Sequence, residues 1–102
     1  MLNELLANYQ IYYQNLRNFH WNVSGPNFFD LHAKFEELYT VANVNVDSVA
    51  ERILTLGARP YSSYGEYIEN SGIKEAKDVN DAMKMVEIIR ENLNVLLTVE
   101  SK

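Results

Sequence analysis

The residues best suited to chemistry lie in one stretch of the sequence, between positions 32 and 51. Polar side chains recur there at spacings of 4, 3, 4, 4 and 4: His32, Glu36, Tyr39, Asn43, Asp47 and Glu51. The first two and the last two form pairs four residues apart, so on a helix the members of each pair point the same way. Imidazole and carboxylate ligands without sulfur are typical of iron, manganese or zinc sites, and iron is favoured where oxidation is the chemistry.

The two pairs cannot bind the same metal ion within one chain. Each pair alone is more often a solvated helix face than a metal site. His32 and Asp47 are separated by about 22 Å along a helix but rotated by only about 60°, whereas ligands lie roughly 2 Å from their metal. Antiparallel packing of two copies about a two-fold axis would place His32 of one chain opposite Asp47 of the other. The spacing therefore predicts two equivalent metal sites, each shared between two subunits.

His20 is a further candidate ligand. It lies at the edge of the apolar stripe of the first helix, just before the turn that leads to the second helix. If the first helix folds back along the second, His20 comes close to His32. The adjacent Trp21 is more commonly a core or interface anchor than a functional residue.

Composition and missing motifs exclude several function classes. The chain has no Cys, which excludes disulfides, thiolate metal sites and cysteine nucleophiles. A net charge of −5 without a basic block argues against DNA as a direct partner and favours cations. The zinc protease pattern, the phosphate-binding loop and the dinucleotide glycine signature are absent. The Glu-x-x-His motif of di-iron sites inside one bundle is absent too, since Arg17 and Phe29 precede the two histidines by three residues.

Hydrophobic periodicity predicts an all-α protein with a single domain over residues 1–102. We expect long helices at 2–23, 28–56 and 79–100, with Asp78 or Asn80 as the N-cap of the last, and a short helix at 63–69 in the connection. Three long helices make up most of a ferritin-like four-helix bundle. The fourth helix is absent, so the chain is either a fragment or completed by another chain. No signal peptide or membrane span is evident, and we expect a cytoplasmic protein without membrane contact.

Two runs carry a specific likeness: NLRNFHWNVSGPNFFDLHAKFEELY at 15–39 and DSVAERILTLG at 47–57. Their residues and spacing resemble those of the Dps family, the mini-ferritins named for DNA protection in starved bacteria. The likeness covers essentially the whole chain. It implies a ferritin-like fold and a hollow dodecamer built from two-fold dimers.

The resemblance also implies an activity and a set of site residues. Family members oxidise Fe²⁺, preferentially with hydrogen peroxide, and store ferric oxide inside the cage. Carried over by position, the ferroxidase ligands and catalytic residues are as follows: His20, His32 and Glu36 from one subunit, and Asp47 and Glu51 from the other. Trp21 matches the family's tryptophan beside the site, which is thought to absorb stray oxidising equivalents.

Three features depart from the family's pattern. Glu36 stands where many members carry Asp, which leaves direct or water-mediated ligation open. The basic N-terminal tail that lets some members bind DNA is missing, and so is the fourth helix with its share of the cage.

We therefore expect iron storage and detoxification through a ferroxidase activity, with iron (Fe²⁺/Fe³⁺) as the metal. The alternatives are a DNA-binding stress-protection protein and an inactive structural helical subunit.

Overall fold

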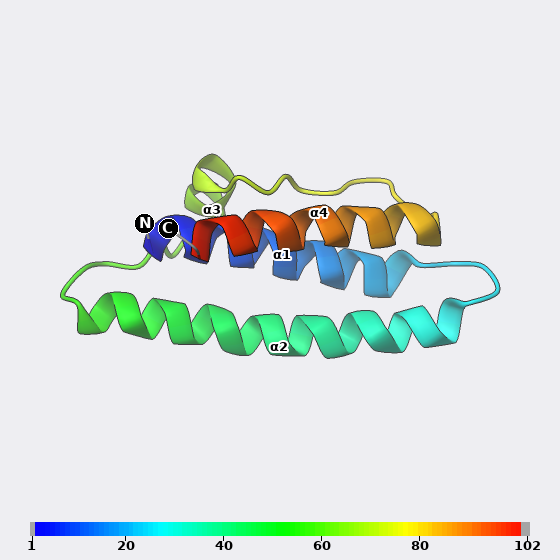
Figure 1. Ribbon diagram of the computed structural model, residues 1–102, viewed down its shortest axis with the longest axis horizontal. Coiled ribbons are helices and arrows are strands. Elements are labelled where there is room, and N and C mark those ends of the chain that lie inside the picture. Colours follow the sequence, from blue (N-terminus) through cyan, green and yellow to red (C-terminus); the bar gives the residue numbers. More distant parts are fainter. Residues whose placement is uncertain (1, 101–102) are drawn as a thin grey trace.

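The computed structural model describes residues 2–100, which form helices joined by turns and extended chain. In order, the helices are α1 (Leu2–Asn22), α2 (Phe28–Thr55), α3 (Tyr64–Asn70) and α4 (Ala82–Glu100). No strand occurs within these residues. Figure 1 shows α1 and α2 as an antiparallel pair, α4 beside α1, and a long connection that returns the chain over α1 from α3 to α4.

The first helix lies at the centre of the molecule because it is apolar on more than one face. It packs against α2, α3 and α4. Its buried residues, which include three polar ones, are Leu5, Leu6, Ala7, Asn8, Ile11, Tyr12, Asn15, Leu16, Phe19 and His20. A helix that buries so wide a surface needs partners on several sides. The three other helices and the connection supply them.

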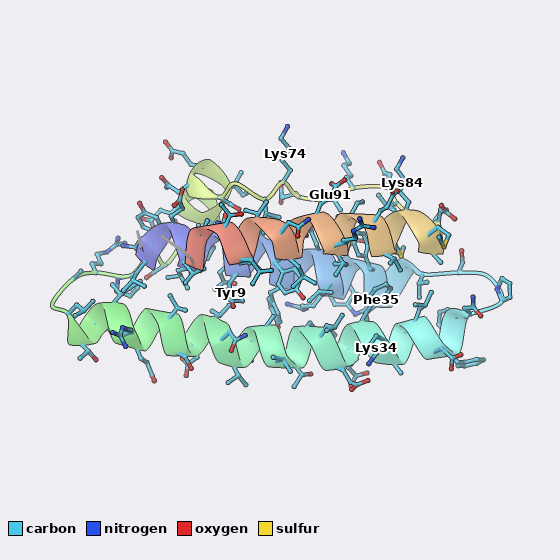
Figure 2. The ribbon with its side chains drawn as sticks, viewed as in Figure 1. Tyr9, Lys34, Phe35, Lys74, Lys84 and Glu91 are labelled. Carbon is cyan, nitrogen blue, oxygen red and sulfur yellow. The ribbon has the colours of Figure 1, made fainter. Side chains whose placement is uncertain are left out.

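The second helix buries only one stripe, and this stripe faces α1. Phe35, Ala42 and Ile53 are its fully buried residues. Figure 2 shows Phe35 and Tyr9 in the space between α2 and the layer made by α1 and α4. Gly25 begins the chain reversal before α2 with φ 103°, and Gly57 ends the helix with φ 83°. Both conformations are left-handed and strongly favour glycine.

The fold class expected from the sequence needs correction in its helix count. We interpreted the chain as three long helices with a minor helix in a connection, and counted the fourth helix as absent. The structure has four helices within residues 2–100. The fourth is α3, which is fixed by a capping box in which Ser63 accepts from the backbone N–H of Glu66 and the Glu66 carboxylate accepts from that of Ser63. The all-α character and the arrangement agree with a ferritin-like bundle.

The N-cap proposed for the last helix was wrong. The helix begins at Ala82, not near residue 79. Asp78 adopts φ 57°, which ends any helical path there. The Asp81 carboxylate instead accepts from the backbone N–H of Lys84 at 3.3 Å, as an N-cap side chain does.

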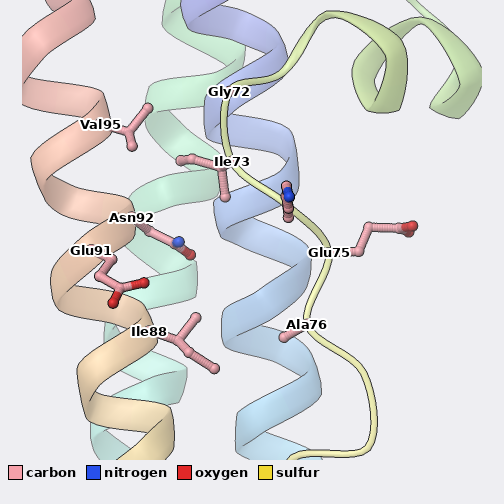
Figure 3. A pocket seen from close by; sticks show the side chains of 9 residues that line it. Gly72, Ile73, Glu75, Ala76, Ile88, Glu91, Asn92 and Val95 are labelled. Carbon is pink, nitrogen blue, oxygen red and sulfur yellow. The ribbon is translucent and has the colours of Figure 1, made fainter.

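The connection before α4 is extended and runs along α1. Residues 72–76 and α4 border a cleft of about 310 Å³, lined by the apolar side chains of Ile73, Ile88 and Val95 with Asn92 at its floor (Figure 3). No helix in the part of the chain that the structure describes is both long and apolar enough to span a membrane.

Candidate metal site

The turn at residues 23–27 brings the end of α1 against the start of α2 and pairs the two histidines of the chain. The Nδ1 atom of His20 lies 2.6 Å from the carbonyl oxygen of His32. In return, Nδ1 of His32 lies 2.7 Å from the carbonyl oxygen of His20. The two rings stack with centroids 3.8 Å apart and planes 16° apart. Each histidine therefore holds the other's ring in place.

This reciprocal pairing also fixes where the ring protons lie. A carbonyl oxygen can only accept a hydrogen bond, so Nδ1 of each ring must carry the proton. In a neutral imidazole the other nitrogen, Nε2, then has its lone pair free for a metal ion. Metal-binding histidines commonly use their second nitrogen in this way, which orients the ring and selects the tautomer. The pair is thus prepared for ligation without side-chain partners from elsewhere.

Glu36 completes a group of three possible ligands. Its Oε1 atom lies 3.8 Å from Nε2 of His20, and one ligand atom from each of His20, His32 and Glu36 lies within 4.8 Å of the others. Ligands about 2.1 Å from a shared ion are separated by about 3 to 3.5 Å, so a small rotation of Glu36 is enough to close the group. Its side chain is 57% exposed, which leaves that rotation unhindered.

Burial changes steadily across the group. His20 is buried, His32 is half-buried and Glu36 is exposed. A cation held here is therefore backed by protein on the His20 side and open on the Glu36 side. Three ligands from one chain leave coordination positions for water, a substrate or a second subunit.

Aromatic rings enclose the histidine pair, and one of them was missed in the sequence. Phe28 stacks on His32 with centroids 5.0 Å apart, and Tyr39 contacts His20 edge-on at 5.3 Å. Phe28 precedes His32 by four residues on the same helix, so helical spacing could have revealed this contact. The two carbonyl bonds could not be foreseen, because they depend on the shape of the turn.

The structure does not bring the other two predicted ligands to this group within one chain. Asp47 and Glu51 are exposed on α2, and Asp47 lies about 22 Å along the helix axis from His32. Trp21 is 57% exposed, and the Arg17 guanidinium lies 4.8 Å from its ring centroid. Among the ring contacts of residues 2–100, none joins Trp21 to either histidine.

Comparisons with known proteins identify the family. The pattern of the ferritin-like domain family matches residues 1–97. A crystal structure of a Dps protein from Vibrio cholerae O1, described as a member of a broad superfamily of ferritin-like diiron-carboxylate proteins, superposes with a TM-score of 0.93 at 47% identity. The chain belongs to the Dps family of ferritin-like proteins. The resemblance noted in the sequence is thereby confirmed.

Other similar proteins agree. The Dps structure from Staphylococcus aureus has a TM-score of 0.88 at 47% identity and covers 91% of this chain and 62% of that one. A DNA protection during starvation protein from Brevibacillus brevis is 49% identical, over 84% of this chain and 58% of its own length. An uncharacterised protein from Haemophilus influenzae is 52% identical, over 94% of this chain and 60% of its own. The chain spans about 60% of the length of these relatives.

Proposed function

We propose that this chain handles iron: it oxidises Fe²⁺ at sites shared between two subunits and contributes to storing the ferric product. The observation that carries the proposal is the histidine pair: both Nδ1 atoms are bonded to carbonyl oxygens, which leaves the Nε2 atoms for a metal ion, and Nε2 of His20 lies 3.8 Å from Glu36. Membership in the Dps family supports iron as the substrate among the metals that this ligand set suits.

The second half of each site comes from another copy of the chain. Asp47 and Glu51 are exposed, four residues apart and on the same side of α2. An antiparallel pairing of two α2 helices about a two-fold axis supplies this acidic pair to the histidine group of the partner subunit. The proposed assembly is a homo-oligomer built from such dimers, which in the Dps family is a dodecamer.

The chemistry assigned to the site follows from its ligands. Fe²⁺ binds first to His32, Glu36 and the Glu51 of the partner subunit, while His20 and the partner's Asp47 hold a second, weaker position. Hydrogen peroxide takes up two electrons, one from each of two ferrous ions, and is reduced to water. Carboxylates suit this reaction because hard oxygen ligands bind the ferric product as well as Fe²⁺, and exposed carboxylates release it by shifting their coordination.

A complementation experiment tests the sharing of ligands. His32→Ala and Asp47→Ala chains are prepared separately, and peroxide-dependent Fe²⁺ oxidation is measured for each alone and after unfolding and refolding them together. Each variant alone lacks a ligand at every site and should be inactive. In an equal mixture half of the dimers contain both variants, and one of their two sites is intact, so about a quarter of the wild-type rate should return.

Two results would contradict the proposal. If the His32→Ala chain alone oxidises Fe²⁺ at the wild-type rate, His32 is not a ligand of the site. If the mixture is as inactive as its two components, the ligands are not shared between subunits. Glu37→Ala is the matched control, since Glu37 is an exposed acid on α2 that forms an ion pair with Lys34 at 3.6 Å. It should oxidise iron as the wild type does.

A further inference from the structure

The amide side chain of Asn92 forms the floor of the cleft between α4 and the extended connection (Figure 3). Ile88, Asn92 and Val95 recur at spacings of four and three, so they lie on one face of α4. Asn92 is only 6% exposed, whereas Ile88 and Val95 are half-buried. The connection adds Ile73 on the opposite wall. The cleft thus combines aliphatic walls with one buried polar group, as sites for small molecules commonly do.

The orientation of the Asn92 amide is fixed by the backbone of the connection. Asn15 accepts at Oδ1 from the N–H of Ala76 at 2.8 Å and donates from Nδ2 to the carbonyl of Lys74 at 3.1 Å. Because an N–H only donates and a carbonyl only accepts, the two ends of the Asn15 amide cannot be exchanged. Nδ2 of Asn15 also donates to Asn92 at 3.0 Å, so the Asn92 atom that faces it must be the acceptor Oδ1. The donor Nδ2 of Asn92 is left over.

This donor has no partner in the protein and is open to the cleft. Nδ2 of Asn92 donates no hydrogen bond within residues 2–100. In the same residues, the only polar side-chain atom that is both enclosed and unpaired is Nδ2 of Asn8. Since the Asn92 donor is unpaired but not enclosed, it reaches the space of the cleft. An unpaired donor on a largely buried side chain is costly, and an acceptor placed against it removes that cost.

The charges around the cleft favour a neutral acceptor over an anionic one. Lys74, Glu75 and Glu91 border the cleft, and all three are exposed. Lys74 points away from the helices (Figure 2), and Glu75 points away from α4 (Figure 3). Glu91 lies next to Asn92 on α4 and would repel a carboxylate placed at the amide. A carbonyl oxygen accepts the same hydrogen bond without that repulsion.

We propose that this cleft binds small neutral carbonyl compounds that carry a branched aliphatic group. The carbonyl oxygen accepts from Nδ2 of Asn92, and the aliphatic group packs against Ile73, Ile88 and Val95. The volume of about 310 Å³ is at the lower end of the range for ligand sites, which limits the ligand to a small molecule or to one residue of a peptide. The connection runs on the side of α1 away from α2 (Figure 1), so this site is separate from the histidine pair and does not depend on iron oxidation.

Probes with one aliphatic group and different head groups test the inference on the full chain. Isovaleramide, isovalerate and isoamylamine carry the same branched group on a neutral amide, a carboxylate and an ammonium group. Each is titrated into isotope-labelled protein, and the backbone amide shifts are followed by NMR. We expect isovaleramide to shift the amides of residues 72–76 and 88–95 with millimolar affinity. The other two probes should bind about tenfold more weakly, because neither offers an uncharged acceptor.

An isosteric substitution tests the donor itself. Asn92→Asp replaces Nδ2 by an oxygen and keeps the acceptor that faces Asn15. It should weaken the binding of isovaleramide about tenfold and strengthen that of isoamylamine, whose ammonium group supplies the donor that the protein has lost. Asn94→Asp is the matched control, because Asn94 is an exposed residue of the same helix. It should bind all three probes as the wild type does.

Three results would overturn the inference: isovaleramide shifts that lie elsewhere or do not saturate, equal affinities of the wild type for isovaleramide and isovalerate, and unchanged isovaleramide binding in a folded Asn92→Asp. The first two need no substitution, so they decide even if the variant does not fold. N-acetylleucine N-methylamide presents the same groups as a peptide does. Tighter binding than that of isovaleramide identifies the ligand as a residue of a peptide, and weaker binding identifies it as a free small molecule.

Discussion

The two flanks of α1 are held by different kinds of contact. Toward α2 the contact is made by rings and aliphatic side chains, with Phe19 against Phe35 at 5.9 Å and the histidine pair at the end. Toward the connection between α3 and α4 it is made by asparagine amides. Asn15 donates to the carbonyl of Lys74 and accepts from the N–H of Ala76, and Asn18 donates to the carbonyl of Ala76.

The difference follows from what each neighbour needs. A helix satisfies its own backbone groups, so α2 requires only an apolar face from α1. An extended segment has unpaired N–H and C=O groups, and burying them without partners is costly. Asparagine carries both a donor and an acceptor, so one side chain satisfies two backbone groups. At the start of the segment Asn8 satisfies one backbone group, because its oxygen accepts from the N–H of Gly72 at 2.6 Å.

Removing a ring from the α2 flank should have the largest effect. Phe19→Ala takes a fully buried side chain out of the core, and we expect a loss of about 3 to 5 kcal/mol in the free energy of unfolding. Urea denaturation measures it. Phe29→Ala, at a position 82% exposed, should change stability by less than about 0.5 kcal/mol. Equal effects of the two substitutions would contradict the assignment of this flank as core.

Removing an amide from the other flank should have the next largest effect. Asn15→Ala leaves the backbone groups of Lys74 and Ala76 and the buried amide of Asn92 without this partner. At about 1 to 3 kcal/mol for each buried group left unpaired, we expect a loss of about 2 to 4 kcal/mol after partial rehydration. Hydrogen exchange should accelerate at residues 71–81, while Co²⁺ binding at the histidine pair stays as in the wild type. Loss of Co²⁺ binding would show that the flanks are not independent.

A substitution within the histidine pair should separate metal binding from stability. His32→Phe keeps a ring between Phe28 and His20 but removes both nitrogens. We expect about 1 kcal/mol of destabilisation, because one hydrogen bond to the carbonyl of His20 is lost. Co²⁺ affinity, followed by its visible absorption, should fall about 100-fold or more, since a ligand is removed as well as its orienting bond. Wild-type affinity would exclude His32 as a ligand.

The smallest effect is expected at α3, where a carboxylate caps the helix. Hydrogen bonds from the backbone of Ser62 and from Arg59 lower the pKa of Glu66 from its ordinary 4.5 to about 2. A lowered folded-state pKa stabilises the protein above the unfolded value, and this contribution disappears as the pH falls from about 4.5 toward about 2. In Glu66→Gln, thermal midpoints should lack this component of the acid dependence. Glu69→Gln on the same helix should retain it.

Much of the α2 flank was predictable from the sequence, and little of the other flank was. Apolar periodicity gave the course of the long helices. All three residues of the histidine group were candidates in the sequence, His32 and Glu36 from their spacing and His20 from the expected folding of the first helix along the second. The sequence did not reveal the role of three asparagines on α1: Asn8, Asn15 and Asn18. Polar residues on a buried helix face can be assigned to an extended neighbouring segment only when the position of that segment is known. The start of α4 was misplaced because Asp78, Asn80 and Asp81 are all acceptable N-caps, and the backbone at Asp78 decides between them.

The reciprocal bonds between the histidines have a consequence for the order of assembly. Each bond joins residues only 12 positions apart in the chain. Closing so short a loop requires little entropy, and it needs neither the return segment nor α4. The histidine pair can thus form as soon as α1 and α2 pack together. Affinity for a metal ion would then arise early in biosynthesis, in a hairpin of two helices, before the rest of the chain has folded.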